Sequence, residues 1–358
     1  MAVTIKDVAR EARVSVASVS RAMNGTPSVT EDTRRHILGV AKRLRYMPHG
    51  AARSLITRRT NTVGALLPDL FGEFFSELIR GIDLAARSRG LHLLVSSSHG
   101  DATEAAAALR AMQGRVDGLL IMSPHVDADF LHDNLPDSLP VVLMNSAMKN
   151  ARYSTLNVDN YGGAFAITQH LVKHGHRHIA LIAGPANNFD AEQRDKGYRA
   201  AMEKCAPGLR SHVVAGDFTE ESGYRAGIEL LAGKPRPSAV FAANDMMAVG
   251  CLYAFAQAGV RVPEDIALAG FDDIPIARYV APALTTVRVR IADLGRTALE
   301  RLAIRLENSG DAPAFAQTLG YEIVVRRTCG AGGQNAAATE RQRKSQSINS
   351  ESKPGREP

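Results

Sequence analysis

Positive charge is concentrated at the beginning of this chain. The first 60 residues contain 12 Lys and Arg against four Asp and Glu, a net charge of +8, whereas all 358 residues together carry +6. The remainder of the chain is therefore slightly acidic. A small, strongly basic block joined to a larger acidic body is typical of proteins that bind nucleic acid.

The basic block has the pattern of three short helices. Thr4 and Asp7 have the spacing of a capping box at the start of a first helix. Ser15 can cap a second helix, and Thr30 can cap a third helix that runs to about residue 44. The third helix is expected to bury Ile37, Leu38, Val40, Ala41 and Leu44. This pattern predicts a helix-turn-helix module.

The second helix of such a module enters the major groove with its N-terminal end first. The hydroxyls of Ser15 and Ser18 suit phosphate oxygens. The side chains of Val16 and Ala17 can read only thymine methyls or other apolar edges, while Arg21 can reach a phosphate or a guanine edge. We predict that the module contacts DNA through Thr4, Ser15, Val16, Ala17, Ser18, Arg21 and Asn24.

Two runs of sequence resemble a known family. The runs VTIKDVAREARVSVASVSRAMNG (3–25) and VTEDTRRHILGVAKRLRYMPHGAARSL (29–55) are similar to the LacI/GalR family of transcriptional repressors, and the similarity continues to about Arg327. The resemblance implies a regulator that binds a pseudo-palindromic DNA operator as a homodimer and responds to a small effector. It also implies a hinge that orders on the operator, pairs with its dimer mate and inserts a leucine into the minor groove.

The segment that matches this hinge is Met47–Leu55. Pro48 ends the third helix, and the residues after it can form about one or two helical turns, which are too short to be stable alone. Leu55 is the predicted minor-groove wedge; the alternative is a plain linker with an exposed leucine. Ala52 allows close approach of a partner helix. The hinge residues predicted to contact DNA are Ala52, Arg53, Ser54 and Leu55.

The chain departs from the family pattern at two positions in the basic block. The family usually has glycine in the turn where this chain has Arg13, and glycine or asparagine near the end of the third helix where it has Arg45. If these backbones need a positive φ, each Arg costs about 1 kcal/mol of stability. Both departures also add positive charge, which can strengthen phosphate contacts.

From Thr62 onward, apolar strand-like runs alternate with amphipathic helices. This alternation predicts parallel sheets flanked by helices, arranged in two similar lobes with a break near Asp159. The fold class is therefore an all-α helix-turn-helix module plus a two-lobed α/β core that resembles periplasmic sugar-binding proteins. The expected strands are Val63–Leu67, Leu91–Val95, Gly118–Met122, Val141–Met144, Ile179–Ala183, Val213–Ala215, Val240–Ala242 and Ile266–Ala269. The expected helices are Glu77–Ser88, Glu104–Met112, Ala164–His174, Glu192–Lys204, Ser222–Leu231 and Met246–Ala258.

The chain is expected to divide into four parts. These are a helix-turn-helix domain at 1–47, a hinge at 48–60, a core at 61–328 and a disordered tail at 329–358, which has almost no large apolar residues. By the resemblance, the chain crosses between lobes three times, with 292–308 returning to the first lobe and 321–325 to the second. The lobe boundaries that follow are 61–158 with 289–317, and 159–288 with 318–328.

The loops after the expected strands carry side chains that suit a sugar. Ligands of parallel sheets bind at the carboxyl ends of the strands, so the cleft between the lobes is the expected site. A guanidinium and a carboxylate can hold neighbouring hydroxyls, while an aromatic ring covers the apolar face of the sugar. The effector-binding residues implied by the family pattern are Phe74, Asn145, Asp159, Arg194, Phe218, Asn244 and Asp272.

Structural roles compete with ligand binding at several of these positions. The alternative for Arg194 and Asp272 is a purely structural salt bridge. Phe74 and Phe75 are not both expected to face the cleft, so one of them belongs to the core. Asn244 and the aspartate after it can instead cap the following helix.

Other classes of function are disfavoured. The chain has no phosphate-binding loop, nucleophile elbow or convincing nucleophile–base pair, which argues against an enzyme. No cofactor or metal is expected, because a cluster of four histidines lacks matching carboxylate or Cys ligands; these are His170, His174, His176 and His178. Three isolated cysteines and the absence of a signal peptide or long apolar run predict a cytoplasmic protein without a membrane span.

The effector and its partners stay open at the level of sequence. Purine-binding members of the family carry an arginine near the position of Asn188, so the favoured effector is a sugar or sugar derivative. Some members are controlled by a phosphoprotein instead. No leucine heptads of the kind found in tetrameric members are visible, which favours a dimer. The alternative function is a cytoplasmic sugar-binding or sensing protein whose basic head binds DNA nonspecifically.

Overall fold

The computed structural model divides into two compact units, Met1–Asn61 and Thr62–Pro358. It describes residues 3–23, 28–47, 59–123, 126–148, 153–205, 207–208, 211–308 and 313–330. Several predicted features lie outside these ranges, namely Asn24, the hinge residues Ala52, Arg53, Ser54 and Leu55, and most of the expected tail. Within the described ranges, no helix combines the length and the apolar content needed to cross a membrane.

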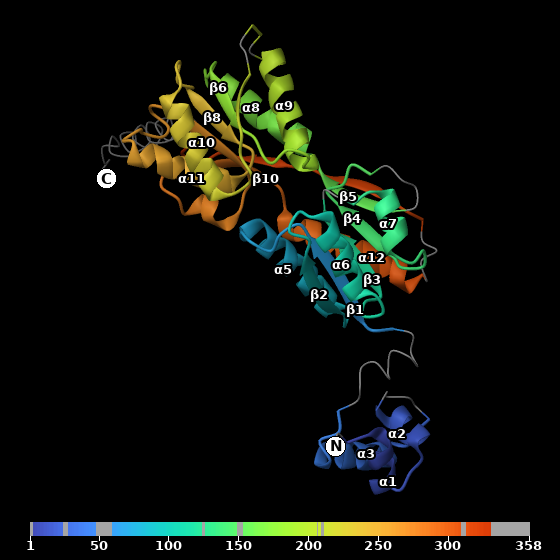
Figure 1. The fold of residues 1–358 in the computed structure, drawn as a ribbon. Helices are drawn as coiled ribbons and strands as arrows, with labels where there is room; N and C mark the ends of the chain where they lie inside the picture. The colour runs from blue at the N-terminus through green and yellow to red at the C-terminus, as the bar shows by residue number, and fades with distance from the viewer. Residues whose placement is uncertain are drawn as a thin grey trace, which may run out of the picture. The chain divides into compact units, whose positions relative to one another are not determined.

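The first unit is the predicted three-helix module (Figure 1). Its helices are α1 (Ile5–Glu11), α2 (Val16–Met23) and α3 (Glu31–Arg43). They enclose a small core whose fully buried members are Val8, Val19, Ile37 and Val40. Leu38 does not join this core as expected, because it follows Ile37 by one helical position and so points away from it. Its side chain is 43% exposed.

The predicted helix caps are confirmed. At α1, the Asp7 carboxylate accepts a hydrogen bond from the backbone N–H of Thr4 at 2.9 Å. At α2, Ser15 Oγ accepts one from the N–H of Ser18 at 3.1 Å. At α3, the hydroxyl of Thr30 accepts one from a first-turn N–H. Each helix therefore begins where a side chain satisfies a backbone group that the helix leaves without a partner.

Both arginines that depart from the family pattern have positive φ. The angle is 54° at Arg13, in the turn between α1 and α2, and 52° at Arg45, just after α3. Side chains with a Cβ enter this left-handed region at a cost, which glycine avoids. The left-handed backbone is thus present at both positions, although each carries arginine where the family usually has a residue that adopts this conformation more easily.

The first lobe of the second unit is built on a six-stranded parallel sheet in the order β11-β5-β4-β3-β1-β2 (Figure 1). Its strands are β1 (Thr62–Leu67), β2 (His92–Ser97), β3 (Gly118–Ile121), β4 (Val141–Met144), β5 (Ser154–Val158) and β11 (Ala316–Leu319). Its helices are α5 (Glu73–Ser88), α6 (Ala102–Met112), α7 (Ala128–Asn134) and α12 (Ile291–Glu307).

Residues of this sheet alternate between two apolar layers. Ala65 and Leu120 pack in the layer that contains α5 and α12, whereas Leu66 and Leu119 pack in the layer that contains α6 and α7. Both faces of the sheet are therefore covered by helices. This explains why its strands read as continuous apolar runs rather than as alternating ones.

The second lobe is also built on a six-stranded sheet, with the strand order β12-β10-β9-β8-β6-β7. Its pairs are parallel, except that β12 runs antiparallel to β10. The strands are β6 (Ile179–Ile182), β7 (His212–Val214), β8 (Ala239–Ala242), β9 (Ala267–Asp272), β10 (Thr285–Arg288) and β12 (Glu322–Val324). The helices are α8 (Asn160–Lys173), α9 (Phe189–Cys205), α10 (Glu220–Ala232), α11 (Asp245–Gln257) and the short η1 (Pro275–Arg278).

The chain passes between the lobes after β5, after β10 and after β11. The boundary expected between residues 317 and 318 needs correction, because β11 continues to Leu319 and the crossing follows it. In both lobes the first strand lies between the second and the third, as β1 does between β2 and β3. Loops diverge where the strand order reverses in this way, which leaves a crevice at the carboxyl ends of the strands.

We predict that Arg13→Gly and Arg45→Gly each stabilise the first unit by about 1 kcal/mol, because glycine relieves the positive φ. Hydrogen–deuterium exchange of the α1–α3 amides in the full-length protein measures this local stability. Arg35→Gly is the matched control, since it removes the same charge from the interior of α3. It should destabilise the unit by about 1 kcal/mol. Equal exchange in all three variants would contradict the assignment of strain.

Candidate functional site

The start of α2 presents the predicted DNA-reading residues to solvent. Ser15, Ala17 and Arg21 are exposed, Val16 is 41% exposed, and Ser18 is half-buried beneath them. The opposite side of α2 packs into the core of the unit. The N-terminal end of α2 can therefore enter a DNA groove. Its apolar side chains Val16 and Ala17 would face the base edges, and the hydroxyl of Ser15 lies beside them.

The exposed surface of this module carries many cations. The exposed cations are Lys6, Arg10, Arg13, Arg21, Arg35, Lys42, Arg43 and Arg45. Two of them form ion pairs within their own helices, Arg10 with Asp7 at 3.3 Å and Arg35 with Asp32 at 2.7 Å. Such exposed pairs are weak, so they leave the field of the unit strongly positive. Thr4 is also exposed, although its hydroxyl donates to Asp7.

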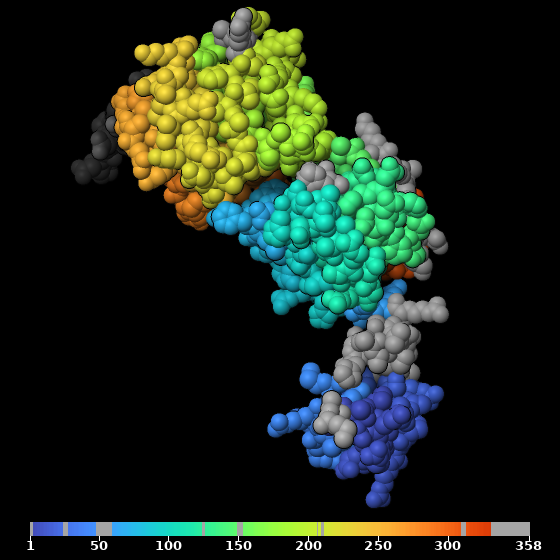
Figure 2. Space-filling view, in the orientation of Figure 1, coloured from blue at the N-terminus to red at the C-terminus, as the bar shows by residue number. Residues whose placement is uncertain are grey.

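A cavity of about 540 Å³ lies between the two lobes of the second unit. These lobes are the cyan-to-green and the yellow-to-orange masses in Figure 2. The cavity is lined by loops that follow β1, β2, β3 and β4 of the first lobe, by loops that follow β6, β7 and β8 of the second, and by the end of β9. It therefore occupies the crevices that the strand order predicts. Six of the seven predicted effector residues line it: Phe74, Asn145, Arg194, Phe218, Asn244 and Asp272.

Arg194 lies at the floor of the cavity and is 4% exposed. Its Nε donates to Asn160 Oδ1 at 2.8 Å and its Nη1 to the carbonyl of Ala243 at 2.6 Å. Its Nη2 lies 3.1 Å from Asp272 Oδ1. The guanidinium also lies over the ring of Phe271, 3.8 Å from its centroid. A planar guanidinium held on several sides in this way is rigidly oriented before any ligand arrives.

Asp272 is the last residue of β9 and has an unusual backbone. Its φ is 111°, in a region that residues with a Cβ rarely adopt. Its side chain is buried, and burial raises the pKa of the carboxyl to about 6 despite the neighbouring Arg194. The ion pair between Arg194 and Asp272 confirms that these two predicted residues meet.

Asp190 is a member of this network that the sequence analysis missed. It lies in the first turn of α9, where its Oδ1 accepts from Asn160 Nδ2 and its Oδ2 from Asn145 Nδ2, both at 2.8 Å. Burial raises the pKa of Asp190, and Arg194 partly offsets that effect. The only signal in the sequence was its position four residues before Arg194, one helical turn away on the same face.

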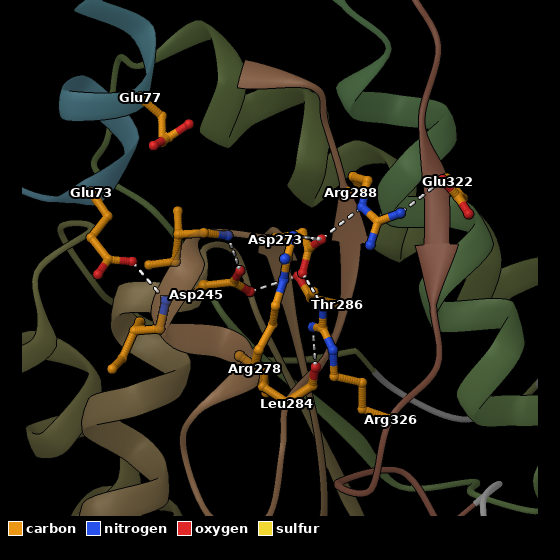
Figure 3. Close-up of polar contacts among 12 residues, drawn as sticks. Glu73, Glu77, Asp245, Asp273, Arg278, Leu284, Thr286, Arg288, Glu322 and Arg326 are labelled. Carbon is orange, nitrogen blue, oxygen red and sulfur yellow. Dashed lines mark hydrogen bonds and ion pairs between the residues drawn. The ribbon is translucent and has the colours of Figure 1, made fainter. Parts of the chain in front are cut away.

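Two hydrogen bonds connect the lobes across the cavity region. Asn145 follows β4 in the first lobe, and it donates to Asp190 of the second. Glu73, in the first turn of α5, accepts from the backbone N–H of Ile276 in η1 at 2.8 Å (Figure 3). Both bonds must change if the lobes move relative to each other.

The loop that presents Asp272 is fixed by the aspartate that follows it. Asp273 is buried and forms ion pairs with Arg288 at 2.6 Å, with Arg326 and with Arg278 at 3.8 Å (Figure 3). These arginines come from β10, from the segment after β12 and from η1. The cluster therefore ties four segments of the second lobe together beside the cavity.

Asp245 also holds the loop that follows Asp272. Its carboxylate accepts from the hydroxyl of Thr286 at 2.6 Å and from the N–H of Ile274 at 3.0 Å (Figure 3). Burial and the nearby Asp272 raise the pKa of Asp245 well above its ordinary range. Of the two residues expected as possible caps of the following helix, Asn244 makes the cap, because its Oδ1 accepts from the N–H of Met247. Asn244 Nδ2 also donates to the carbonyl of Phe218, so this residue positions an aromatic wall.

Aromatic rings form much of the cavity wall. Five of the 11 phenylalanines of the chain line it, namely Phe71, Phe74, Phe75, Phe189 and Phe218. Phe74 and Phe75 pack edge to face with centroids 5.3 Å apart, and both reach the cavity, which corrects the expectation that only one would. A Cβ at Gly184 would lie 2.5 Å from the ring of Phe218, so glycine is needed to seat that ring.

Backbone strain is concentrated at the cavity. Of the nine described non-glycine residues with positive φ, five line it: His99, Asn145, Asn187, Phe218 and Asp272. Strained residues persist only where the surrounding structure holds them, and they gather at ligand sites. Backbone strain therefore marks this cavity as the candidate functional site of the second unit.

One predicted effector residue lies elsewhere. Asp159 does not line the cavity, because its carboxylate caps α8 by accepting from the N–H of Gly162 at 2.8 Å. The histidine cluster also has ordinary partners. For example, His176 meets Ser238 Oγ and His178 meets a backbone carbonyl. Among the described residues, no group of three or more His, Cys, Asp or Glu could hold a metal ion.

Comparison with known proteins matches both units. Residues 4–49 match the family described as bacterial regulatory proteins, lacI family, and residues 168–329 match the periplasmic binding protein-like domain. Catabolite control protein A of Priestia megaterium is 34% identical over 331 residues, which cover 92% of this chain and 99% of that protein. The transcriptional repressor PurR of Erwinia tasmaniensis is 36% identical over 336 residues, which cover 92% and 97%.

Solved structures give the same result. A lac repressor dimer bound to operator and the anti-inducer ONPF has a TM-score of 0.82 at 27% identity, with 92% of this chain and 99% of that chain covered. The complex of the transcriptional regulator CelR with cellobiose has a TM-score of 0.68 at 31% identity, with 91% and 99% covered. The similarity therefore includes the helical unit as well as the two lobes.

We predict that Asp272→Asn stabilises the second unit at neutral pH. The folded-state pKa of Asp272 is raised to about 6, so the wild-type protein loses stability as the pH rises through this value. Asn does not ionise, so the variant should gain on the order of 1–3 kcal/mol at pH 7.5 and nothing below pH ~4. Urea unfolding at several pH values measures the difference.

The matched control is Asp273→Asn, which changes the neighbouring residue in the same way. Asp273 is surrounded by three arginines. Its neutralisation leaves partly buried cations without their counter-ion and should destabilise the protein by about 3 kcal/mol or more at pH 7.5. If the two variants shift stability in the same direction, the division between a ligand-facing and a structural aspartate is wrong.

Proposed function

The chain belongs to the LacI family of bacterial regulatory proteins, which are DNA-binding transcriptional repressors with a ligand-binding core, and from this premise we propose how it works. It binds a pseudo-palindromic operator as a homodimer through α2. A small, sugar-like effector occupies the interlobe cavity and changes the affinity for the operator. No covalent chemistry is part of this role.

The observation that carries the proposal is the cavity itself. A buried guanidinium and carboxylates lie at its floor, phenylalanine rings form its walls, and both lobes contribute. Hydroxyl groups of a sugar would meet Arg194 and Asp272, while its apolar face would lie against an aromatic ring. The solved neighbour CelR holds cellobiose, which supports a ligand of this class, and the lac repressor neighbour holds a small anti-inducer, ONPF.

Coupling to DNA requires a ligand that favours one arrangement of the lobes. An effector shifts a conformational equilibrium only by its difference in affinity for the two states. Asn145 and Asp190 come from different lobes and lie together at the cavity, so a ligand that contacts both acts directly on the lobe interface. The hinge between the units would transmit this change to the operator, as the family resemblance implies.

The experiment that tests the proposal is selection of bound duplexes from randomised DNA by the full-length protein. We expect a palindromic sequence to be recovered, because a symmetric dimer reads two half-sites. The selection is repeated with a panel of sugars and nucleosides, since some regulators need a corepressor. Recovery of no sequence under any of these conditions would contradict specific operator binding and favour nonspecific binding by the basic unit.

We predict that Leu55→Ala weakens binding to the selected operator by about tenfold or more while binding to random DNA is unchanged. The substitution removes a minor-groove wedge but no charge, and nonspecific affinity depends mainly on charge. Fluorescence anisotropy with both duplexes, at two salt concentrations, measures the two affinities. Arg53→Ala serves as the control, because loss of a cation should weaken both. An equal loss for both duplexes with Leu55→Ala would show that the leucine is not a wedge.

A further inference from the structure

One face of β5 is polar although this strand lies inside a sheet that helices cover on both sides. β5 is flanked by β4 and β11, and strands in such a position are usually apolar on both faces. On one face, Leu156 and Val158 are buried in the apolar core. On the other face lie Tyr153, Thr155 and Asn157, because successive strand residues point to opposite sides. The polar groups of this second face indicate that it meets something other than an apolar core.

This polar face borders a second cavity, of about 530 Å³, which we call the β5 cavity. β5, the start of β11 and the loop after β4 line it from the first lobe, and the first turns of α9 line it from the second. Its volume is in the range of small-molecule sites, which is about 300–1,000 Å³. Among the described residues, only Phe189 lines both this cavity and the interlobe cavity, so the two are separate sites with a shared wall.

Two polar side chains at the β5 cavity have no hydrogen-bond partner among the described residues, namely those of Thr155 and Gln193. Thr155 is only 6% exposed, and Gln193 is half-buried. A buried hydroxyl or amide without a partner is costly, so native proteins rarely leave one in this state. The amide of Asn157 differs, because it accepts from the N–H of Ser146 at 2.9 Å and donates to the Ser146 carbonyl at 3.0 Å. Thr155 and Gln193 are therefore the groups with which a ligand can pair.

The rest of the lining restricts the chemistry of such a ligand. The lining that the structure describes contains no Asp, Glu, Lys, Arg or His, so a charged ligand would lose its hydration without gaining a counter-ion. Tyr153, Phe189 and Phe315 contribute aromatic rings, and Met148 contributes a thioether. These groups favour contact with another aromatic ring. A sugar would find too few polar partners for its many hydroxyls, because apolar and aromatic side chains form most of this lining.

We propose that the β5 cavity binds a neutral, planar aromatic ring that carries a carboxamide or a lactam. The ring packs against Phe189 and Phe315, and its amide edge pairs with Gln193 and Thr155. Gln193 offers donors and an acceptor that complement those of an amide ligand, and the hydroxyl of Thr155 can donate or accept. The inference goes beyond the proposed function, since it requires neither an operator nor an effector in the interlobe cavity.

The test uses the full-length protein with isotope-labelled methionine methyl groups, observed by NMR. Met148 lines the β5 cavity, whereas Met122 and Met246 line the interlobe cavity, so the methyl signals report which cavity is occupied. A Met→Leu variant at each of these positions assigns its signal. The neutral planar probes are benzamide, nicotinamide and pyridone. Benzoate and nicotinate are their charged counterparts, and cyclohexanecarboxamide has the same amide on a ring that is not flat.

We expect the neutral planar probes to shift the Met148 signal in a saturable way, and to shift it more than the signals of Met122 and Met246. The charged counterparts should bind at least about tenfold more weakly, because their burial is not compensated by a counter-ion. Cyclohexanecarboxamide should also bind more weakly, because it cannot stack on the phenylalanine rings.

Variants locate the contacts. Thr155→Val and Gln193→Leu should each weaken benzamide by about fivefold or more, because each removes a hydrogen-bonding group while keeping a similar shape. Thr168→Val is the matched control, since the hydroxyl of Thr168 donates within α8 and lines neither cavity. It should leave the affinity unchanged.

Three results would overturn the inference. The first is that no neutral planar probe shifts the Met148 signal, which would assign the β5 cavity to water alone. The second is that the charged probes bind as tightly as the neutral ones. The third is that the probes shift Met122 and Met246 but not Met148, which would place them in the interlobe cavity.

Discussion

The ion pair between Arg194 and Asp272 is the contact on which the interlobe site depends. It places opposite charges in a setting where water is nearly absent, and such pairs stabilise a protein little once the cost of desolvation is included. Burial raises the pKa of Asp272 more than the attraction of Arg194 lowers it, since that pKa is about 6. A charge kept in the protein at a cost to stability is typical of a site maintained for binding.

The remainder of the second unit holds this pair in position. Asp273 and Asp245 anchor the residues that follow the strained backbone of Asp272, Asp273 through three arginines and Asp245 through Thr286 and the N–H of Ile274. Asp190 and Asn160 orient Arg194 from the other side. Asn145 belongs to the first lobe and donates to Asp190 of the second. A ligand that alters this hydrogen bond therefore alters the contact between the lobes.

Much of the fold could be predicted from the sequence because the relevant signals are local. Buried parallel strands such as Val141–Met144 appear as short apolar runs, and caps such as Ser15 and Thr30 mark the helix starts. Four strands were not predicted as strands, because their residues look polar or are partly exposed. The threonines of β10 are buried but not apolar, β5 includes Ser154, and the edge strands β11 and β12 are half exposed.

The site was predicted less completely, since its residues depend on tertiary contacts. Arg194 and Asp272 follow family motifs, and a salt bridge was one of their two expected roles, but the raised pKa of Asp272 and the role of Asp190 arise only when α9 and β9 come together. Asp159 was misassigned because a residue at a lobe junction can equally cap a helix, as it does. The hinge prediction at Leu55 lies outside the described residues.

We propose that the charges at the cavity floor serve ligand binding and not the stability of the fold. The most direct measurement is the free energy of unfolding of a variant that carries Asn160→Leu, Asp190→Leu, Arg194→Met and Asp272→Leu together, so that the buried amide that bonds Asp190 and Arg194 is replaced with them. We expect a stability within about 1 kcal/mol of wild type or higher, because apolar residues replace a charge cluster together with its polar partner. We also expect that operator binding no longer responds to the ligand of the wild-type protein. A loss of about 3 kcal/mol or more would contradict this proposal and assign the cluster to the stability of the core.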